Sequence, residues 1–203
     1  ARAMDDPTFI AVSGKGNFKT LEDLVSASKK APLNWGVAQI GGTEHIGLAQ
    51  FAKEAGIKFK VVPFGSGAQM VQALMAGKID ATLPNVSEAA NQVADGSFRA
   101  LAVMAEDRLK DYPNVPSTFE KGIKAKCSTT RGYAVLASTP QPIIDQISKA
   151  MVKAMKHDVF KSYLAGAGLT VETSVAGTKV WDKHLKAEYK VAEAALKELG
   201  LVK

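Results

Sequence analysis

The regular alternation of short apolar runs with helix-like segments is the feature that most restricts the fold of this chain. The strand-like runs are FIAVSG (9–14), LNWGVA (33–38), IKFKVVPF (57–64), IDATLPN (79–85) and RALAVMA (99–105). Helix-like segments lie between them, at about 20–30, 43–55, 65–78 and 86–96. Strands and helices that alternate with such short connections favour a largely parallel sheet covered by helices. The sequence therefore predicts an α/β fold.

Helix-end signals support this division of the chain. Thr20 is a good N-cap, and Glu22 and Asp23 follow it in the first turn, near the positive end of the expected helix. Gly56 stands where a left-handed C-cap residue is expected after the helix at 43–55. The boundaries of at least two helices are thus marked by residues suited to those positions.

The character of the chain changes after Ala105. The stretch 106–130 contains two prolines and many turn-forming residues, which predicts a crossing segment. A strand, RGYAVLAS (131–138), is expected next, and then helices at about 143–156, 159–165 and 178–199. We place the domain boundary near residues 125–131, which divides the 203-residue chain into 1–125 and 126–203.

The loops that follow three of the strands, at 39–45, 64–68 and 84–87, are the main functional clue. In parallel sheets, ligands bind beyond the carboxyl ends of the strands, where loops lead into helix N-termini. In the stretch GVAQIGGTEH (36–45), a glycine pair lets a ligand approach closely, and the free N–H groups of Gly42, Thr43 and Glu44 favour an anion. The Thr43 hydroxyl and a ring N–H of His45 would add donors.

A second loop of this kind, FGSGA (64–68), offers the backbone N–H groups of Ser66 and Gly67. A carboxylate and a phosphate fit both loops equally well on this argument. The alternative is that these glycines only form tight turns between strand and helix, with His45 packed in the interior. Asn85 and Ser87 follow a third strand end at the same edge. The alternative for both is plain capping of the next helix, for which Ser87 is the candidate N-cap.

Arg131 precedes the strand expected at 131–138 and has two interpretations. Its guanidinium group is suited to a bidentate pair with a ligand carboxylate. A structural salt bridge within the protein is the alternative.

Composition and motif spacing argue against several other functions. The net charge is +6, but most of the basic residues are lysines spread over several segments, which favours a solvated surface over a nucleic-acid patch. The three histidines lack metal-binding spacing, and no nucleotide-binding glycine motif is present. The single cysteine, Cys127, excludes an internal disulfide, and a neutral thiol is expected there. We therefore expect no metal, no cofactor and no catalysis.

The sequence has no membrane-spanning signal. No apolar run approaches the roughly 20 residues that a membrane-spanning helix needs. The first residues, ARAMDDPTFIAVSG, do not have the layout of a signal peptide. If the protein is exported, its signal is therefore not present in this chain.

The region 33–89 resembles a known family. It contains a strand, then Gly42-Thr43-Glu44-His45, then Val62-Pro63-Phe64 with a glycine–serine turn, and then a helix that ends in Gly77-Lys-Ile-Asp80. RALAVMAEDRLKDYPNVPSTFEKG (99–122) resembles the next family segment. Together these motifs resemble the substrate-binding proteins of tripartite tricarboxylate transporters, the TctC or Bug family, over essentially the whole chain.

The resemblance implies a two-lobed, type II periplasmic-binding-protein fold that holds a small carboxylate, such as a di- or tricarboxylate, between its lobes. It implies a periplasmic location and delivery of the ligand to the membrane permease subunits of a transporter. Residues 1–125 would be a complete lobe, and 126–203 the C-terminal part of the other. It implies a ligand carboxylate on the backbone N–H groups of the 41–45 loop, with 65–67 and 85–87 lining the cleft. Together with Gln39 and Arg131, the candidate ligand-binding residues are Gln39, Gly41, Gly42, Thr43, Glu44, His45, Gly65, Ser66, Gly67, Asn85, Ser87 and Arg131.

The chain departs from the family pattern at its N-terminal side. Family members begin with about half a lobe before DDPTFIAV, and that part, which grips the ligand from the opposite side, is absent from this sequence. Two expectations follow. Residues 130–203 should expose apolar surface or associate with a second chain, and ligand affinity should be weak.

Two further functions use the same architecture. One is an α/β enzyme that acts on a small anionic substrate, and the other is the effector-binding domain of a transcription regulator. The enzyme would need an acid–base pair at the three loops, and the regulator would need a DNA-binding segment upstream of Ala1. Neither the identity of the carboxylate nor the oligomeric state follows from the sequence.

Overall fold

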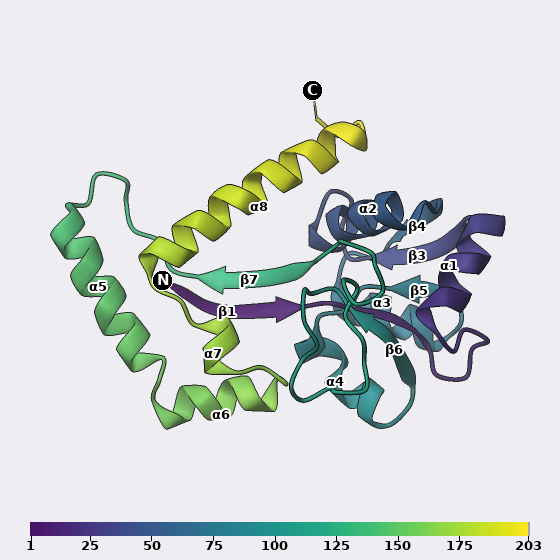
Figure 1. The fold of residues 1–203 in the computed structure, drawn as a ribbon, viewed down its shortest axis with the longest axis horizontal. Helices are drawn as coiled ribbons and strands as arrows, with labels where there is room; N and C mark the ends of the chain where they lie inside the picture. The colour runs from purple at the N-terminus through teal and green to yellow at the C-terminus, as the bar shows by residue number, and fades with distance from the viewer. Residues whose placement is uncertain (203) are drawn as a thin grey trace.

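The computed structural model describes residues 1–202 and contains one five-stranded sheet with helices on both faces (Figure 1). The strand order is β4-β3-β5-β2-β6. Its strands are β2 (Phe9–Ser13), β3 (Leu33–Val37), β4 (Phe59–Pro63), β5 (Ala81–Thr82) and β6 (Phe98–Val103).

The sheet is rich in parallel pairs, as predicted. β3 pairs in parallel with both β4 and β5, whereas β2 is antiparallel to its neighbours β5 and β6. Because β5 and β6 both oppose β2, they run in the same direction, and β2 is the one reversed strand of this sheet. The carboxyl ends of β3, β4 and β5 therefore lie at one edge.

Helices cover the two faces of the sheet because successive strand residues point to opposite sides. Ile10 and Val12 of β2 belong to a core with α1 (Leu21–Lys30) and α2 (Thr43–Ala55). The alternate β2 residues belong to a second core with α3 (Gly67–Met75) and α4 (Val86–Ala94). Trp35 and Phe51, both fully buried, pack against each other in the first core.

The predicted helix-end signals are confirmed. Thr20 caps α1 in a capping box, since its side chain accepts from the Asp23 N–H while the Asp23 carboxylate accepts from the Thr20 N–H. Gly56 ends α2 in the left-handed conformation, with φ of 63°.

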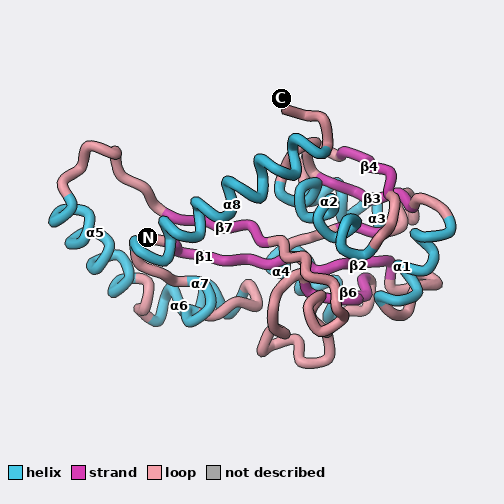
Figure 2. Tube along the Cα trace, turned by 45° about the horizontal axis from the view of Figure 1, so that its top comes forward, coloured by secondary structure: helices cyan, strands magenta, loops and turns pink. Residues whose placement is uncertain are grey.

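A two-stranded antiparallel ribbon leads away from the sheet toward the remaining helices (Figures 1 and 2). It pairs β1 (Arg2–Pro7) with β7 (Ser128–Gly132), with a register irregularity between Arg2 and Met4. The remaining helices are α5 (Gln141–Ala154), α6 (Asp158–Gly166), α7 (Val171–Ser174) and α8 (Thr178–Glu198). The long helix α8 runs back from the ribbon toward α2 (Figure 1).

The division of the chain into two domains, 1–125 and 126–203, stays a prediction.

The strand predicted at 131–138 is displaced in the structure. β7 ends at Gly132, and residues 133–140 form an exposed loop. Just beyond this end, the Tyr133 N–H donates to the carbonyl of Ala1. The loop that follows is apolar enough for a strand, but among residues 1–202 no strand lies alongside it to complete a ladder.

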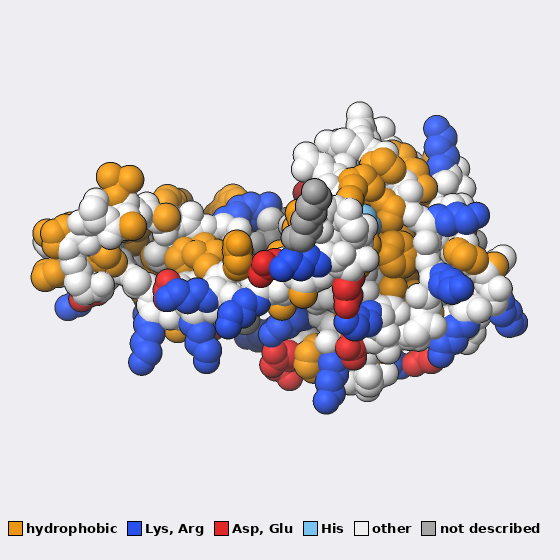
Figure 3. Space-filling model, turned by 90° about the horizontal axis from the view of Figure 1, so that it is seen from above, with side chains coloured by type: hydrophobic (Ala, Val, Ile, Leu, Met, Phe, Trp, Pro, Cys, Tyr) orange, Lys and Arg blue, Asp and Glu red, His pale blue; other side chains and the backbone are white. Residues whose placement is uncertain are grey.

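The part of the molecule around α5 exposes apolar side chains, as expected from the sequence. Leu136 is 79% exposed, and Tyr133, Val135 and Ile143 are also exposed. A hollow of about 360 Å³ lies between residues 133–137, α5 and α8. Hydrophobic side chains gather at this end of the molecule in the space-filling view (Figure 3).

Gly47 is the tightest packing point between α2 and the start of the ribbon, and it gives a direct test of the fold. A Cβ atom there would lie 2.4 Å from Sγ and 2.6 Å from Cβ of Cys127. Gly47→Ala should therefore lower the free energy of unfolding by about 2 kcal/mol or more in urea titrations. Cys127→Gly in the same chain should recover part of that loss.

The matched control is Gly166→Ala, since a Cβ atom at Gly166 in α6 meets nothing within 4 Å. This substitution should be neutral or slightly stabilising. Equal destabilisation by both substitutions would contradict the packing at Gly47.

Candidate functional site

The structure brings the three predicted loops together at one edge of the sheet. In the ladders, Gly36 of β3 lies opposite Val62 of β4 and Thr82 of β5. The loops after β3 and β4 are joined directly, because the Gly65 N–H donates to the carbonyl of Ala38 at 2.8 Å. The N-termini of α2, α3 and α4 follow these loops and lie on the same side of the molecule.

The first loop leaves unpaired backbone donors at the start of α2. Gly42 is the N-cap of α2. The first backbone N–H of this helix with an acceptor in the chain is that of Ile46, which donates to the carbonyl of Gly42. Within residues 1–202, the N–H groups of Thr43, Glu44 and His45 have no acceptor. Thr43 itself is exposed. This is the arrangement that favours an anion at a helix N-terminus.

His45 stabilises the loop from the inside. Its Nδ1 atom accepts a hydrogen bond from the Gly41 N–H at 3.0 Å, and the side chain is 5% exposed. Burial lowers the pKa of His45, so the ring is neutral near pH 7 and can act as this acceptor. The Gly41 N–H is thereby used within the loop, as is the Gly42 N–H, which donates to the carbonyl of the exposed Gln39.

The far side of the first loop packs against the end of α8. Gly41 has a φ of +75°, and a Cβ atom there would lie 3.3 Å from Leu196 and 3.5 Å from Leu201. An ion pair between Lys53 of α2 and Glu198 joins the same two helices at 2.5 Å. The loop is therefore backed by protein on one side and open to solvent at Thr43.

The second loop contains a capped helix start with an acidic neighbour. The Ser66 hydroxyl accepts from the Gln69 N–H at 3.3 Å, so Ser66 is the N-cap of α3. Gly65 precedes it with φ of +78°. The carboxylate of Glu88, from the first turn of α4, lies against Gly67, where it would be 3.0 Å from a Cβ atom.

At the third loop, a side chain of the protein itself accepts hydrogen bonds from the N-terminal turn of α4. Asp6 of β1 is fully buried, and its carboxylate accepts from the Ser87 N–H at 3.2 Å and from the Ser87 hydroxyl at 2.5 Å. The expectation that Ser87 caps the helix is wrong: Asn85 is the N-cap, and Ser87 is the second helical residue.

Asn85 holds the ribbon strands to the lobe. Its Nδ2 donates to the carbonyl of Asp6 at 2.7 Å, and its Oδ1 accepts from the Thr129 hydroxyl at 3.1 Å. Arg131 forms an ion pair with Asp6 at 3.4 Å, which is the structural salt bridge considered for it. Its side chain is still 49% exposed.

Sequence reasoning missed Asp6 and Glu88. Asp6 lies in a strand that was not predicted, and only its tertiary position shows that it faces a helix start. Glu88 is an ordinary acidic first-turn residue in the sequence, and its approach to Gly67 depends on how α3 and α4 pack. Burial of Asp6, and the partial burial of Glu88, raise the pKa of both carboxyls above their usual range.

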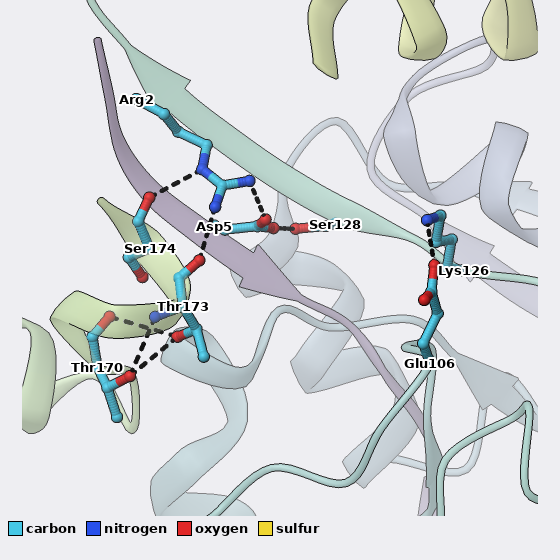
Figure 4. A network of polar contacts seen from close by, with 8 residues as sticks. All are labelled: Arg2, Asp5, Glu106, Lys126, Ser128, Thr170, Thr173 and Ser174. Atoms are coloured by element: carbon cyan, nitrogen blue, oxygen red, sulfur yellow. Dashed lines mark hydrogen bonds and ion pairs between the residues drawn. The ribbon is translucent and has the colours of Figure 1, made fainter. Parts of the chain in front are cut away.

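The opposite face of the ribbon carries a separate polar network (Figure 4). Because neighbouring strand residues alternate, Asp5 points away from the face that holds Asp6. Asp5 pairs with Arg2 at 2.5 Å and accepts from the Ser128 hydroxyl, and Arg2 also donates to the carbonyls of Thr173 and Ser174 (Figure 4). This face borders a cavity of about 760 Å³. It is a different part of the molecule from the three loops.

Other chemistries find little support in residues 1–202. No group of three or more His, Cys, Asp or Glu side chains in this range is arranged to hold a metal ion. Cys127 is buried, and burial raises the pKa of its thiol to about 12, which agrees with the neutral thiol expected. None of the helices in this range combines the length and apolar character needed to cross a lipid bilayer.

Comparison with known proteins identifies related sequences. Residues 2–201 match the family described as the tripartite tricarboxylate transporter family receptor, TctC. A protein of Agrobacterium vitis, a UPF0065 protein, is 26% identical over 186 residues, which are 90% of this chain and 54% of that protein. BugT of Bordetella pertussis is 23% identical over 170 residues, 82% of this chain and 52% of BugT. The chain thus spans about half the length of these curated relatives.

Solved structures of this type share the fold. A TctC solute-binding protein from Polaromonas has a TM-score of 0.86 and 25% identity, covering 97% of this chain and 68% of that protein. A Rhodopseudomonas palustris protein with adipate has a TM-score of 0.79 and 22% identity, covering 98% of this chain and 67% of that one. MatC from the same species, with bound malate, has a TM-score of 0.74 and 19% identity, covering 95% and 67%.

The raised pKa of Asp6 predicts a pH dependence of stability. A carboxyl whose pKa is higher in the folded state binds its proton more tightly there, so its contribution to stability is full below the usual carboxyl pKa and falls as the pH rises through the folded value. Asp6→Asn should remove this slope, so the variant should gain in stability relative to the parent chain as the pH rises above the usual carboxyl value of about 4. Urea unfolding at several pH values measures this difference.

Asp95→Asn is the control for this measurement. Hydrogen bonds from Ser97 lower the pKa of Asp95, so its removal should produce a slope of the opposite sign. A pH-independent difference between Asp6→Asn and the parent chain would contradict the burial of an ionisable carboxyl at α4.

Proposed function

The chain belongs to the tripartite tricarboxylate transporter receptor family, and from this membership we propose that it binds a small carboxylate and delivers it to membrane permease subunits. The proposed site is the N-terminus of α2, with the loops before α3 and α4 forming the rest of its wall. The protein acts in the periplasm in this proposal, as a receptor that binds without catalysis.

One observation carries the proposal: three consecutive backbone N–H groups, of Thr43, Glu44 and His45, lack an acceptor within residues 1–202. A carboxylate has two oxygens that accept such donors, and the helix dipole adds an attraction of the right sign. The neutral His45 ring stabilises the glycine turn that exposes them. This arrangement matches recognition of an anion and requires no group that transfers protons.

The neighbouring structures support a carboxylate over other anions. Adipate and malate are named as the ligands of two of them, both carboxylates. Another neighbour is described as the periplasmic binding protein BugD, which supports the proposed location. Delivery to a permease rests on the family description, which names its members as transporter receptors.

The affinity of this chain for its ligand should be weak. The chain covers only 67–68% of the solved receptors named above. Residues 1–202 provide one wall of the site, and a ligand held on one side retains much of its contact with water. Binding tighter than micromolar in a calorimetric titration would contradict this part of the proposal.

Two substitutions at Thr43 distinguish the contribution of its backbone N–H to ligand affinity from that of its side chain. Thr43 is the first helical residue, where proline is well tolerated, so Thr43→Pro removes one N–H and keeps the helix. Loss of one hydrogen bond to a charged group should weaken carboxylate binding by about tenfold or more, whereas Thr43→Ala should have a smaller effect. Amide NMR shifts during titration with acetate or malate give the affinities.

Two further variants complete this test. His45→Ala should also weaken binding, because the Gly41 turn loses its acceptor. Asp158→Pro is the control, since it places proline at the first position of the remote helix α6. If Thr43→Pro leaves the affinity unchanged, the carboxylate does not bind at α2.

Self-association is the second part of the proposal and has its own test. The apolar surface around residues 133–137 and α5 should bring chains together at high concentration. Light scattering should detect a mass above 21.5 kDa that increases with concentration. Leu136→Lys, at the most exposed of these side chains, should reduce the association. A compact monomer at every concentration would exclude it.

A further inference from the structure

The three helix starts at the proposed site differ in how far the protein neutralises them itself. At α4, the carboxylate of Asp6 already accepts two hydrogen bonds from Ser87. At α2, three N–H groups have no acceptor within residues 1–202, and one carboxylate oxygen of Glu44 would lie 3.6 Å from a Cβ atom at Gly42. The start of α3 is intermediate, because Ser66 caps one N–H and the Glu88 carboxylate lies beside Gly67.

Glu88 reaches α3 from the first turn of the neighbouring helix α4. Both of its carboxylate oxygens would lie within 3.2 Å of a Cβ atom at Gly67, so the group lies directly against the first residue of α3. The absence of a side chain at Gly67 is what allows this approach. Glu88 remains exposed to solvent at the edge of the loops, where a ligand would arrive.

The charges around Glu88 leave this corner negative. Asp6 and Glu44 act on it with the same sign, and Arg131 acts with the opposite sign. Arg131 forms its ion pair with Asp6. The charged groups that act on Glu88 are therefore two carboxylates and one guanidinium.

We propose that Glu88 is a specificity-determining residue, which keeps a ligand carboxylate away from the N-terminus of α3 and favours an ammonium group there. The inference rests on the proposed function, since it assumes that one ligand carboxylate binds at α2. The ligand class is then a carboxylate with a cationic or neutral group at its other end. A dicarboxylate short enough to span α2 and α3 is disfavoured.

The physical reason is the competition between two like charges for one helix start. A ligand carboxylate at Gly67 would share the positive end of α3 with Glu88 and be repelled by it at close range. An ammonium group at the same place is attracted by Glu88, and the negative charges of Asp6 and Glu44 act in the same direction. Discrimination thus depends on the sign of the distal group more than on its size.

The test compares two probes of similar length on the complete 203-residue chain. Succinate carries a carboxylate at each end, and 4-aminobutyrate carries an ammonium in place of one of them. In amide NMR titrations, the parent chain should bind 4-aminobutyrate at least about fivefold more tightly than succinate. In Glu88→Gln and Glu88→Ser, succinate should gain about fivefold or more, and acetate should be unchanged. The Gly67 and Ala68 amides should respond to succinate only in these variants.

The control is Glu54→Gln, which removes the same charge from an exposed position on α2. It should leave the ratio of the two affinities unchanged. Succinate shifts at Gly67 and Ala68 that are equal in the parent chain and in Glu88→Gln would overturn the proposal. A similar gain in Glu54→Gln would also overturn it, because the effect would then be one of net charge.

Two sets of amides separate this inference from the proposed function. Failure of the Thr43–His45 amides to respond to acetate in any variant would overturn the proposed function, on which the inference rests. A response at Thr43–His45 without the change in the ratio of the succinate and 4-aminobutyrate affinities would overturn the inference alone.

A pH titration of the parent chain without ligand gives an independent check. The Gly67 amide should follow the ionisation of a nearby carboxyl, and this dependence should disappear in Glu88→Gln.

Discussion

The buried carboxylate of Asp6 is the interaction on which the arrangement of this molecule depends. It binds the start of α4 through Ser87 and pairs with Arg131 of the neighbouring strand, while its backbone carbonyl accepts from Asn85. One residue of β1 thereby attaches both ribbon strands to the lobe. A buried carboxylate is costly unless its oxygens are well bonded. The position of the ribbon relative to the three loops is consequently determined at this point.

The same carboxylate also distinguishes the start of α4 from the other two helix starts. Asp6 accepts from Ser87 at the start of α4, and the Glu88 carboxylate lies beside Gly67 at the start of α3. At the start of α2, three consecutive N–H groups have no acceptor within residues 1–202. Three similar strand–helix loops therefore have three different electrostatic characters. The difference comes from side chains that reach each helix start from other elements. A comparison of the loop sequences alone would treat them as equivalent.

Much of the lobe, and less of the rest, could be predicted from the sequence. The alternating runs between 9 and 105, the caps at Thr20 and Gly56 and the common edge of the three loops depend on local signals, and the structure confirms them. β1 was missed because RAMDDP is polar and forms a strand only by pairing with β7, more than 100 residues away. The strand expected at 131–138 failed for the converse reason, since an apolar run needs a neighbouring strand. The roles of Asp6 and Glu88 likewise depend on long-range packing.

Helix α8 gives the molecule a mechanical connection that bypasses the ribbon. It begins at Thr178, whose N–H is held by Ser148 of α5, and ends where Leu196 packs against the back of Gly41. At 1.5 Å per residue, its 21 residues form a rod about 30 Å long. A rotation of α5 about the ribbon would therefore be transmitted through α8 to the turn at Gly41. The N–H groups proposed to bind an anion are thereby connected, through α8, to the part of the molecule around α5.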